Sequence, residues 1–101
     1  MGILLLKEVL ADIDSADESL TIYIDATALP HDTSAVALVK YVGPGTVAPT
    51  GMKYFLSIED AKGAIDTWSK WRGGRRPTDS DRCEAVIHYA RMDAYLPVTS
   101  T

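Results

Sequence analysis

Apolar and polar residues follow different spacings along this chain, and each spacing predicts a type of element. Residues 20–25, Leu-Thr-Ile-Tyr-Ile-Asp, alternate cleanly and predict a strand with one buried face. Residues 35–42 are more continuously apolar and predict a central strand, which Gly43-Pro44-Gly45 ends. Residues 52–56, Met-Lys-Tyr-Phe-Leu, predict a short strand that is buried on at least one face.

Spacings of three and four residues follow residue 57 and predict an amphipathic helix of about four turns. Ser57 and Asp60 stand at its start as in a capping box, and Gly73 offers a left-handed stop. Gly63 weakens the helix, so we expect a close helix contact at that position. The predicted buried face consists of Ile58, Ala61, Ala64, Ile65, Trp68 and Trp71.

Two more segments have helical spacing. Thr78, after Pro77, is suited to begin a second helix. The apolar stripe of that helix consists of Cys83, Val86, Ile87, Ala90 and Ala94.

Residues 3–13 predict a first helix, although residues 3–6 also fit the start of a strand. The face of this first helix that we expect to be buried consists of Leu6, Val9, Leu10 and Ile13. Residues 95–98 predict a short edge strand, because Pro97 cannot donate a backbone hydrogen bond.

These elements predict one α+β domain over residues 1–101. Its sheet has three to four strands and is mainly antiparallel, with three helices packed on it. A chain of 101 residues can form a single core without disulfides or metals.

The lone cysteine, Cys83, excludes an internal disulfide and indicates a reducing compartment. The first six residues are too short for a signal peptide, and no apolar run reaches the length of a membrane span. We therefore expect a cytoplasmic protein with no membrane partner.

Charge is unevenly distributed around a formal net charge of −4. Residues 1–50 hold seven acidic residues and two lysines, whereas residues 51–101 hold eight basic and seven acidic residues. The acidic half argues against a general nucleic-acid-binding protein and suits a basic partner. Four of the acids cluster in one predicted turn: Asp12, Asp14, Asp17 and Glu18. Such a cluster is either a solvated face or a negative patch that steers a basic partner.

Aromatic and basic residues are mixed between residues 68 and 76. The simplest interpretation is that Trp68 is core while the cations are solvated and satisfy a helix end. Trp and Arg are also enriched at protein interfaces, and aromatics beside cations can stack on nucleic-acid bases. Trp71, Arg75 and Arg76 are therefore further candidates for partner binding.

The spacing of reactive residues predicts no enzyme, no cofactor and no metal site. The glycines between residues 43 and 51 lack the Lys-Ser or Lys-Thr pair of a phosphate loop. Cys83 and His88 are five residues apart, which places them on different sides of a helix. His31 and Asp32 are too few ligands for a metal without help from elsewhere, and a loop turn explains them.

The stretch Tyr54-Phe55-Leu56-Ser57-Ile58, followed by two helices and by Tyr89…Asp93-Ala94-Tyr95, resembles a family of small bacterial proteins. Some members of that family resemble immunity proteins of contact-dependent or polymorphic toxin systems. The resemblance covers roughly residues 35–97, and the loop at residues 72–76 departs from the family pattern. The family has no catalytic motif that could be transferred to this chain. It implies a protein that binds a cognate toxin domain and blocks it.

We therefore expect an immunity protein that neutralises a toxin by steric and electrostatic occlusion. Such toxins are often basic nucleases, so an acidic inhibitor can cover a cationic substrate cleft. The alternative is a regulatory or adaptor protein that binds nucleic acid or another protein through the basic loop at residues 70–76. The candidate contact residues are Asp12, Asp14, Asp17, Glu18, Trp71, Arg75 and Arg76.

Overall fold

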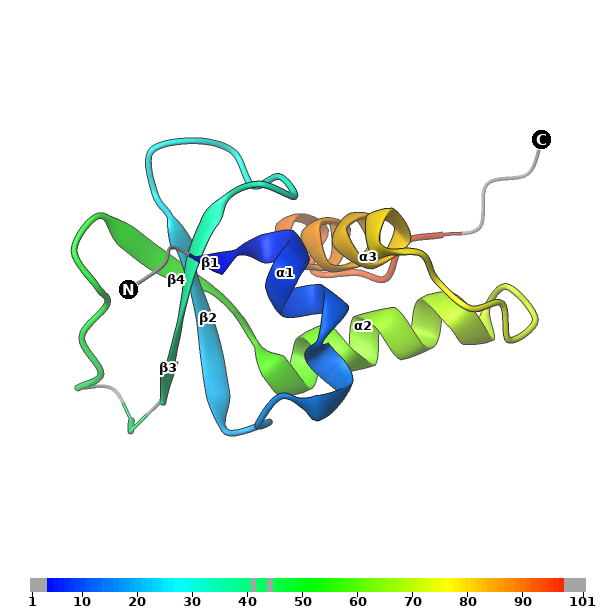
Figure 1. Cartoon of the computed structure of the whole chain (residues 1–101), viewed down its shortest axis with the longest axis horizontal. Helices are drawn as coiled ribbons and strands as arrows, with labels where there is room; N and C mark the ends of the chain where they lie inside the picture. The colour runs from blue at the N-terminus through cyan, green and yellow to red at the C-terminus, as the bar shows by residue number, and fades with distance from the viewer. Residues whose placement is uncertain (1–3, 41, 44, 98–101) are drawn as a thin grey trace.

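The computed structural model describes residues 4–40, 42–43 and 45–97. Four strands form one sheet in the order β1-β3-β2-β4, and every neighbouring pair is antiparallel. The strands are β1 (Leu4–Leu5), β2 (Leu20–Asp25), β3 (Ala35–Lys40) and β4 (Met52–Ser57). The helices of the described residues are α1 (Leu6–Ala11), α2 (Ile58–Lys70) and α3 (Asp79–Met92), with a 3-10 turn η1 (Ile13–Ser15). The predicted α+β class is confirmed (Figure 1).

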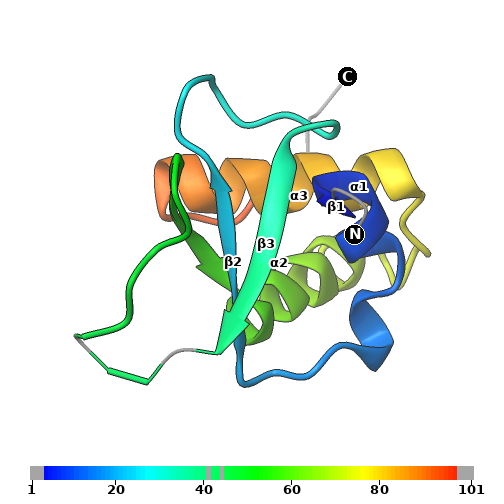
Figure 2. The same cartoon turned by 60° about the vertical axis from the view of Figure 1, so that its left-hand side comes forward.

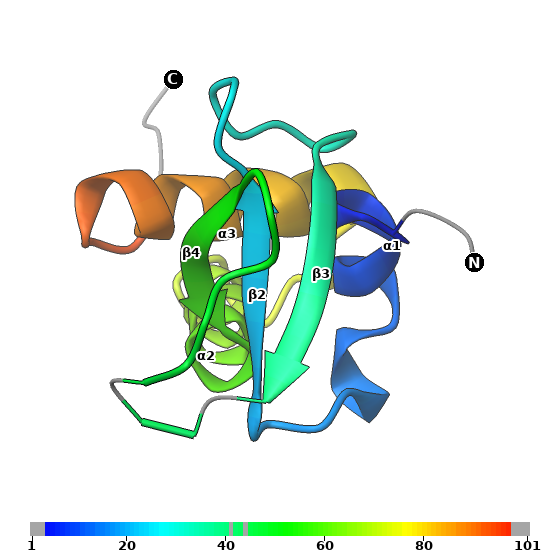
Figure 3. The same cartoon turned by 90° about the vertical axis from the view of Figure 1, so that its left-hand side faces the viewer.

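All three helices lie on one face of the sheet. Figures 2 and 3 show α2 and α3 behind the strands, with α1 beside them. The core lies between these layers, because the alternation of β2 turns Ile22 and Ile24 toward the helices, where both are fully buried. The prediction of a single buried face for β2 is wrong, since Thr21 and Tyr23 on the other face are buried too. Leu6 and Leu10 of α1 join this core, so the predicted apolar face of the first segment is confirmed.

A bulge in β4 explains why two consecutive residues of that strand are buried. Ile22 pairs with Leu56, but the next residue of β2, Tyr23, pairs with Tyr54. Phe55 is the extra residue on β4, so Phe55 and Leu56 both enter the core. Tyr54 is left on the outer face, where its ring meets that of Tyr23 edge to face at 6.1 Å.

Both long helices begin at the predicted caps. The Ser57 hydroxyl accepts the Asp60 backbone N–H at 3.1 Å, but the described contacts hold no return bond from Asp60. α2 thus has the expected N-cap without the full capping box. The full box forms in α3, where the Thr78 hydroxyl accepts the Asp81 N–H and the Asp81 carboxylate accepts the Thr78 N–H. Gly73 has φ +70° after α2, as its stop signal predicts.

Several predicted boundaries are wrong. The segment predicted as one helix over residues 3–13 divides into β1, α1 and η1, and residue 3 lies outside the described residues. β3 ends at Lys40, and Val42 is exposed. α3 stops at Met92 because Asp93 adopts a left-handed conformation with φ 53°, which leaves Ala94 exposed outside the stripe. Residues 95–97 form no strand, and residue 98 lies outside the described part of the chain.

Two expectations for α2 also fail. Apart from its chain neighbours and the backbone of its own helix, nothing lies within 4 Å of a Cβ built on Gly63, so this glycine serves no close helix contact. Trp68 is buried as expected, but Trp71 is half exposed and does not widen the buried face. Trp71 follows the last residue of α2, and its ring packs on Tyr95 at 5.8 Å between centroids instead.

Candidate partner-binding surface

The four candidate acids lie in one exposed turn, which Ile13 fixes to the core. Ile13 is fully buried, whereas Asp12, Asp14, Asp17 and Glu18 are all exposed. The turn keeps its shape through local hydrogen bonds, because the Asp12 carbonyl accepts the backbone N–H of Ser15 at 3.1 Å and its hydroxyl at 3.0 Å. We call residues 12–18 the acidic turn.

Two cations from the long helices bind backbone carbonyls next to the acidic turn and within it. Arg82 of α3 donates from Nη1 to the carbonyls of Leu10 at 2.9 Å and Ala11 at 3.2 Å. Lys62 of α2 donates from Nζ to the Ala16 carbonyl at 3.0 Å. The side chains of both cations are largely covered, at 13% exposure for Arg82 and 23% for Lys62. Arg82 therefore fixes the end of α1 that leads into the turn, and Lys62 fixes the turn itself.

The same two cations pair only loosely with the carboxylates. Lys62 Nζ lies 3.6 Å from Glu18 Oε1, and Arg82 Nη2 lies 3.9 Å from Asp14 Oδ2. The carboxylate side chains are 61% and 88% exposed, and ion pairs in such exposed settings contribute little. The cations thus position the backbone while the carboxylates stay open to a partner.

Asp17 and Asp12 complete the negative surface. The Ser19 backbone N–H donates to Asp17 Oδ1 at 2.9 Å, and this bond holds the pKa of Asp17 below its usual value. Asp17 is therefore charged at neutral pH. The Asp12 side chain makes no hydrogen bond or ion pair with any residue that the structure describes.

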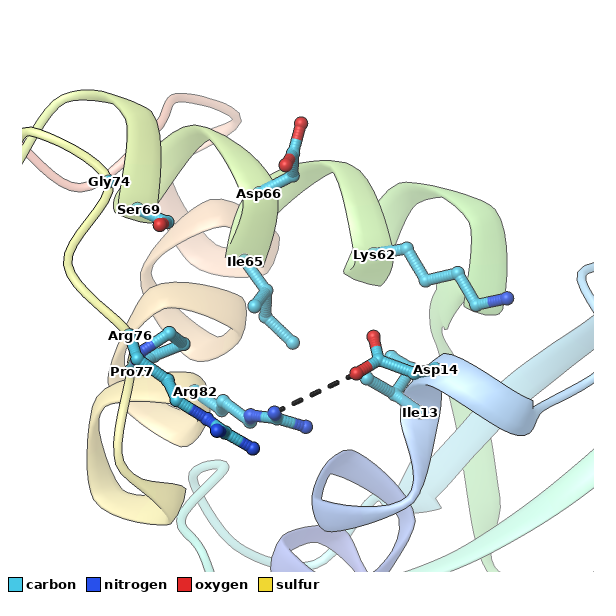
Figure 4. Close-up of a pocket in the computed structure, with 10 residues that line it drawn as sticks. All are labelled: Ile13, Asp14, Lys62, Ile65, Asp66, Ser69, Gly74, Arg76, Pro77 and Arg82. Carbon is cyan, nitrogen blue, oxygen red and sulfur yellow. Dashed lines mark ion pairs between the residues drawn. The ribbon is translucent and has the colours of Figure 1, made fainter.

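A cleft separates the acidic turn from the loop that joins α2 to α3 (Figure 4). Its volume is about 390 Å³. The charged residues that line it are Asp14, Lys62, Asp66, Arg76 and Arg82. The structure thus brings together Asp14 and Arg76, two candidates that stand 62 positions apart in the sequence numbering.

Trp71 and Arg75 lie away from this cleft. Trp71 packs on Tyr95 of the segment after α3, and Tyr95 in turn packs on Tyr89 at 5.1 Å. In Figure 1 the segment after α3 passes behind the long helices, whereas α1 lies in front of them. Figure 3 confirms that the two lie on opposite sides. Arg75 stacks over the Trp68 ring at 5.7 Å. The candidate residues therefore form two surfaces and not one.

Lys62 and Arg82 are the site residues that sequence analysis missed. Arg82 reaches Leu10 across 72 positions, and Lys62 reaches Ala16 across 46. No local pattern connects such distant residues. The only available signal was that each stands next to a buried position, Ala61 or Cys83, of an amphipathic helix.

The described residues hold no group of three or more His, Cys, Asp and Glu side chains that could bind a metal ion. Cys83 is buried, and this burial raises the pKa of its thiol to about 11. The thiol is therefore protonated and a poor nucleophile at neutral pH. None of the described helices is long and apolar enough to cross a lipid bilayer.

Comparison with protein-family models, with curated proteins and with solved structures finds no significant match to this chain. The surface of the molecule and the resemblance of residues 54–58 and 89–95 are therefore the basis for the function proposed below.

Proposed function

We propose that this protein is a cytoplasmic immunity protein that binds a cognate bacterial toxin domain and blocks it. The acidic turn is the principal contact surface. A basic toxin domain, for example a nuclease, would lose access to its substrate once its cationic cleft meets these carboxylates. No cofactor takes part, because inhibition needs only steric coverage and opposite charge.

The observation that carries this proposal is how the acidic turn is held. Arg82 binds the last carbonyls of α1, directly before the turn, and Lys62 binds the Ala16 carbonyl within it, so the turn is held in place without a partner. A preordered surface loses less conformational entropy on binding than a flexible one.

The first experiment identifies the partner. We would purify the tagged full chain from its own host and identify by mass spectrometry whatever co-purifies in equal amount. The proposal predicts a domain that arrests growth when expressed alone and that becomes harmless when this protein is co-expressed. Recovery of the protein alone, or a partner with no toxicity, would contradict the immunity function.

The alternative is an adaptor that binds nucleic acid through Arg75 and Arg76. The observation that favours it is the exposed basic loop, in which Gly73 and Gly74 both have positive φ and Arg76 is free of ion pairs to the described residues. Salt-dependent binding of single-stranded nucleic acid separates the two functions, because only the adaptor loses this binding when Arg75 and Arg76 are replaced by Gln.

A further inference from the structure

Arg82 uses only part of its guanidinium group. Nη1 donates to two backbone carbonyls, but Nε is buried without a hydrogen-bond partner in the structure. Nη2 lies 3.9 Å from Asp14, which is beyond hydrogen-bond distance. A buried donor without a partner is unusual in a folded protein. Nη2 is not among the buried atoms, so it is the nitrogen of Arg82 that an oxyanion in the cleft can reach.

Arg76 supplies a second guanidinium beside the first. Arg76 and Arg82 line the same cleft, and in the view of Figure 4 their side chains run alongside each other, with Arg82 extending toward Asp14. Arg76 is exposed and makes no hydrogen bond or ion pair with the residues that the structure describes. Two adjacent cations repel each other unless a negative charge lies between them.

The other charged residues of the cleft do not supply that negative charge. Asp66 pairs with Lys70 at 2.9 Å, and in Figure 4 its side chain points away from the arginines. Lys62 extends toward the opposite end of the cleft, where it binds Ala16 and Glu18. Of the carboxylates that line the cleft, only Asp14 lies at the end that holds the two arginines, so the lining at this end has an excess of positive charge.

We propose that Arg76 and Arg82 form a binding site for one oxyanion, which we call the arginine notch. Its ligand is a phosphate or carboxylate group, because two guanidinium groups match an acceptor that offers several oxygens. The cleft, at about 390 Å³, admits a ligand larger than a single ion. Asp14 competes with the ligand from inside the cleft, so it sets the affinity of the notch. This site does not depend on the immunity function, since it is defined by the chain alone.

Inorganic phosphate and acetate are the probes that test the arginine notch. We would titrate each into the ¹⁵N-labelled full chain at constant ionic strength and follow the backbone amide signals. We expect saturable shifts, with a dissociation constant in the millimolar range, for amides of residues 13–14, 74–76 and 78–82. The anion that binds more tightly distinguishes a phosphate-bearing ligand from a carboxylate-bearing one. An absence of saturable shifts with both anions would overturn the proposal.

Two substitutions test whether the anion binds between Arg76 and Arg82. Arg76→Gln is expected to weaken binding by about fivefold or more, as the loss of a charge-assisted contact does. Asp14→Asn removes the competing carboxylate and is expected to tighten binding by about two- to fivefold, the range of an exposed ion pair. Arg82 is left unchanged, because its Nη1 atom also supports α1.

Arg75→Gln is the matched control. It removes the same charge from the same loop, but Arg75 stacks on Trp68 and does not line the cleft. We expect it to leave the dissociation constant within about twofold of wild type, as for screened charges that make no contact. If Arg75→Gln and Arg76→Gln weaken anion binding equally, the anion responds only to the general charge of the loop and is an adventitious ion only, which would overturn the proposal. Weaker or unchanged binding in Asp14→Asn would place the anion outside the notch.

Discussion

At the scale of single residues, the molecule depends on cations that bind backbone carbonyls. The last carbonyls of a short helix have no partner within that helix, and α1 has only six residues. Arg82 satisfies two of them, at Leu10 and Ala11, from a different helix. A single side chain therefore connects the stability of α1 to the placement of the acidic turn.

We expect Arg82→Met to lower the free energy of unfolding by about 1–3 kcal/mol, because it removes hydrogen bonds from a charged donor while it keeps much of the apolar stem. Urea denaturation measures this change. Amide hydrogen exchange in residues 12–18 should also accelerate, since the turn loses a support. Arg91→Met, at an exposed position of the same helix, should stay within about 0.5 kcal/mol of wild type. Equal stability of the two variants would contradict the role of Arg82.

At the scale of elements, α2 contains several residues that favour a helix and one, Gly63, that disfavours it. Ser57 caps its first turn, Ile58 to Trp68 supply a continuous buried face, and Gly73 and Gly74 end it. Gly63 stands in the middle of this helix with φ in the helical range and with open space where a Cβ would lie. Nothing in the structure requires glycine at this position.

Gly63→Ala should therefore stabilise the protein by about 0.5–1 kcal/mol, because alanine loses less backbone entropy in a helix than glycine does. Thermal or urea unfolding gives the change directly. Gly73→Ala is the opposite control, since its φ of +70° strains any residue with a Cβ, and it should lower stability. Destabilisation by Gly63→Ala would show that the helix needs a close approach at this position after all.

Local patterns in the sequence predicted most of these elements. The alternation of residues 20–25 predicted β2, and Thr78 marked the start of α3, because caps and periodicity act within one or two turns. The end of α3 was missed, since the left-handed Asp93 has no strong signal in the sequence. The bulge at Phe55 was missed as well, because it depends on how β4 pairs with a strand 30 residues earlier.

At the scale of the whole molecule, the fold determines which candidate residues can act together. Arg76 was predicted as part of a basic loop, yet it lines the same cleft as Asp14, whereas Trp71 lies on the other side of the long helices. Only the packing of α1 on α3 and of η1 on α2 creates this arrangement, and no spacing within either half of the sequence could predict it. A partner that binds over the acidic turn would therefore lie next to the proposed arginine notch, on the opposite side of the long helices from Trp71.

The central claim is that the acidic turn binds the partner, and the association rate of the captured partner tests it most directly. We would measure this rate by stopped flow at several salt concentrations, for wild type and for a variant with all four acids replaced by their amides. The replaced acids are Asp12, Asp14, Asp17 and Glu18. Opposite charges accelerate encounter by about tenfold or more at low salt, so the variant should associate more slowly and lose most of its salt dependence.

The control variant carries the same change in net charge at exposed acids elsewhere on the chain, namely Asp32, Glu59, Asp79 and Glu84. We expect this control to associate nearly as fast as wild type, because steering is strongest for the charges nearest the contact and salt screens the others more. A slow rate confined to the acidic-turn variant is the result that the account predicts. Equal rates and equal salt slopes in the three proteins would contradict it.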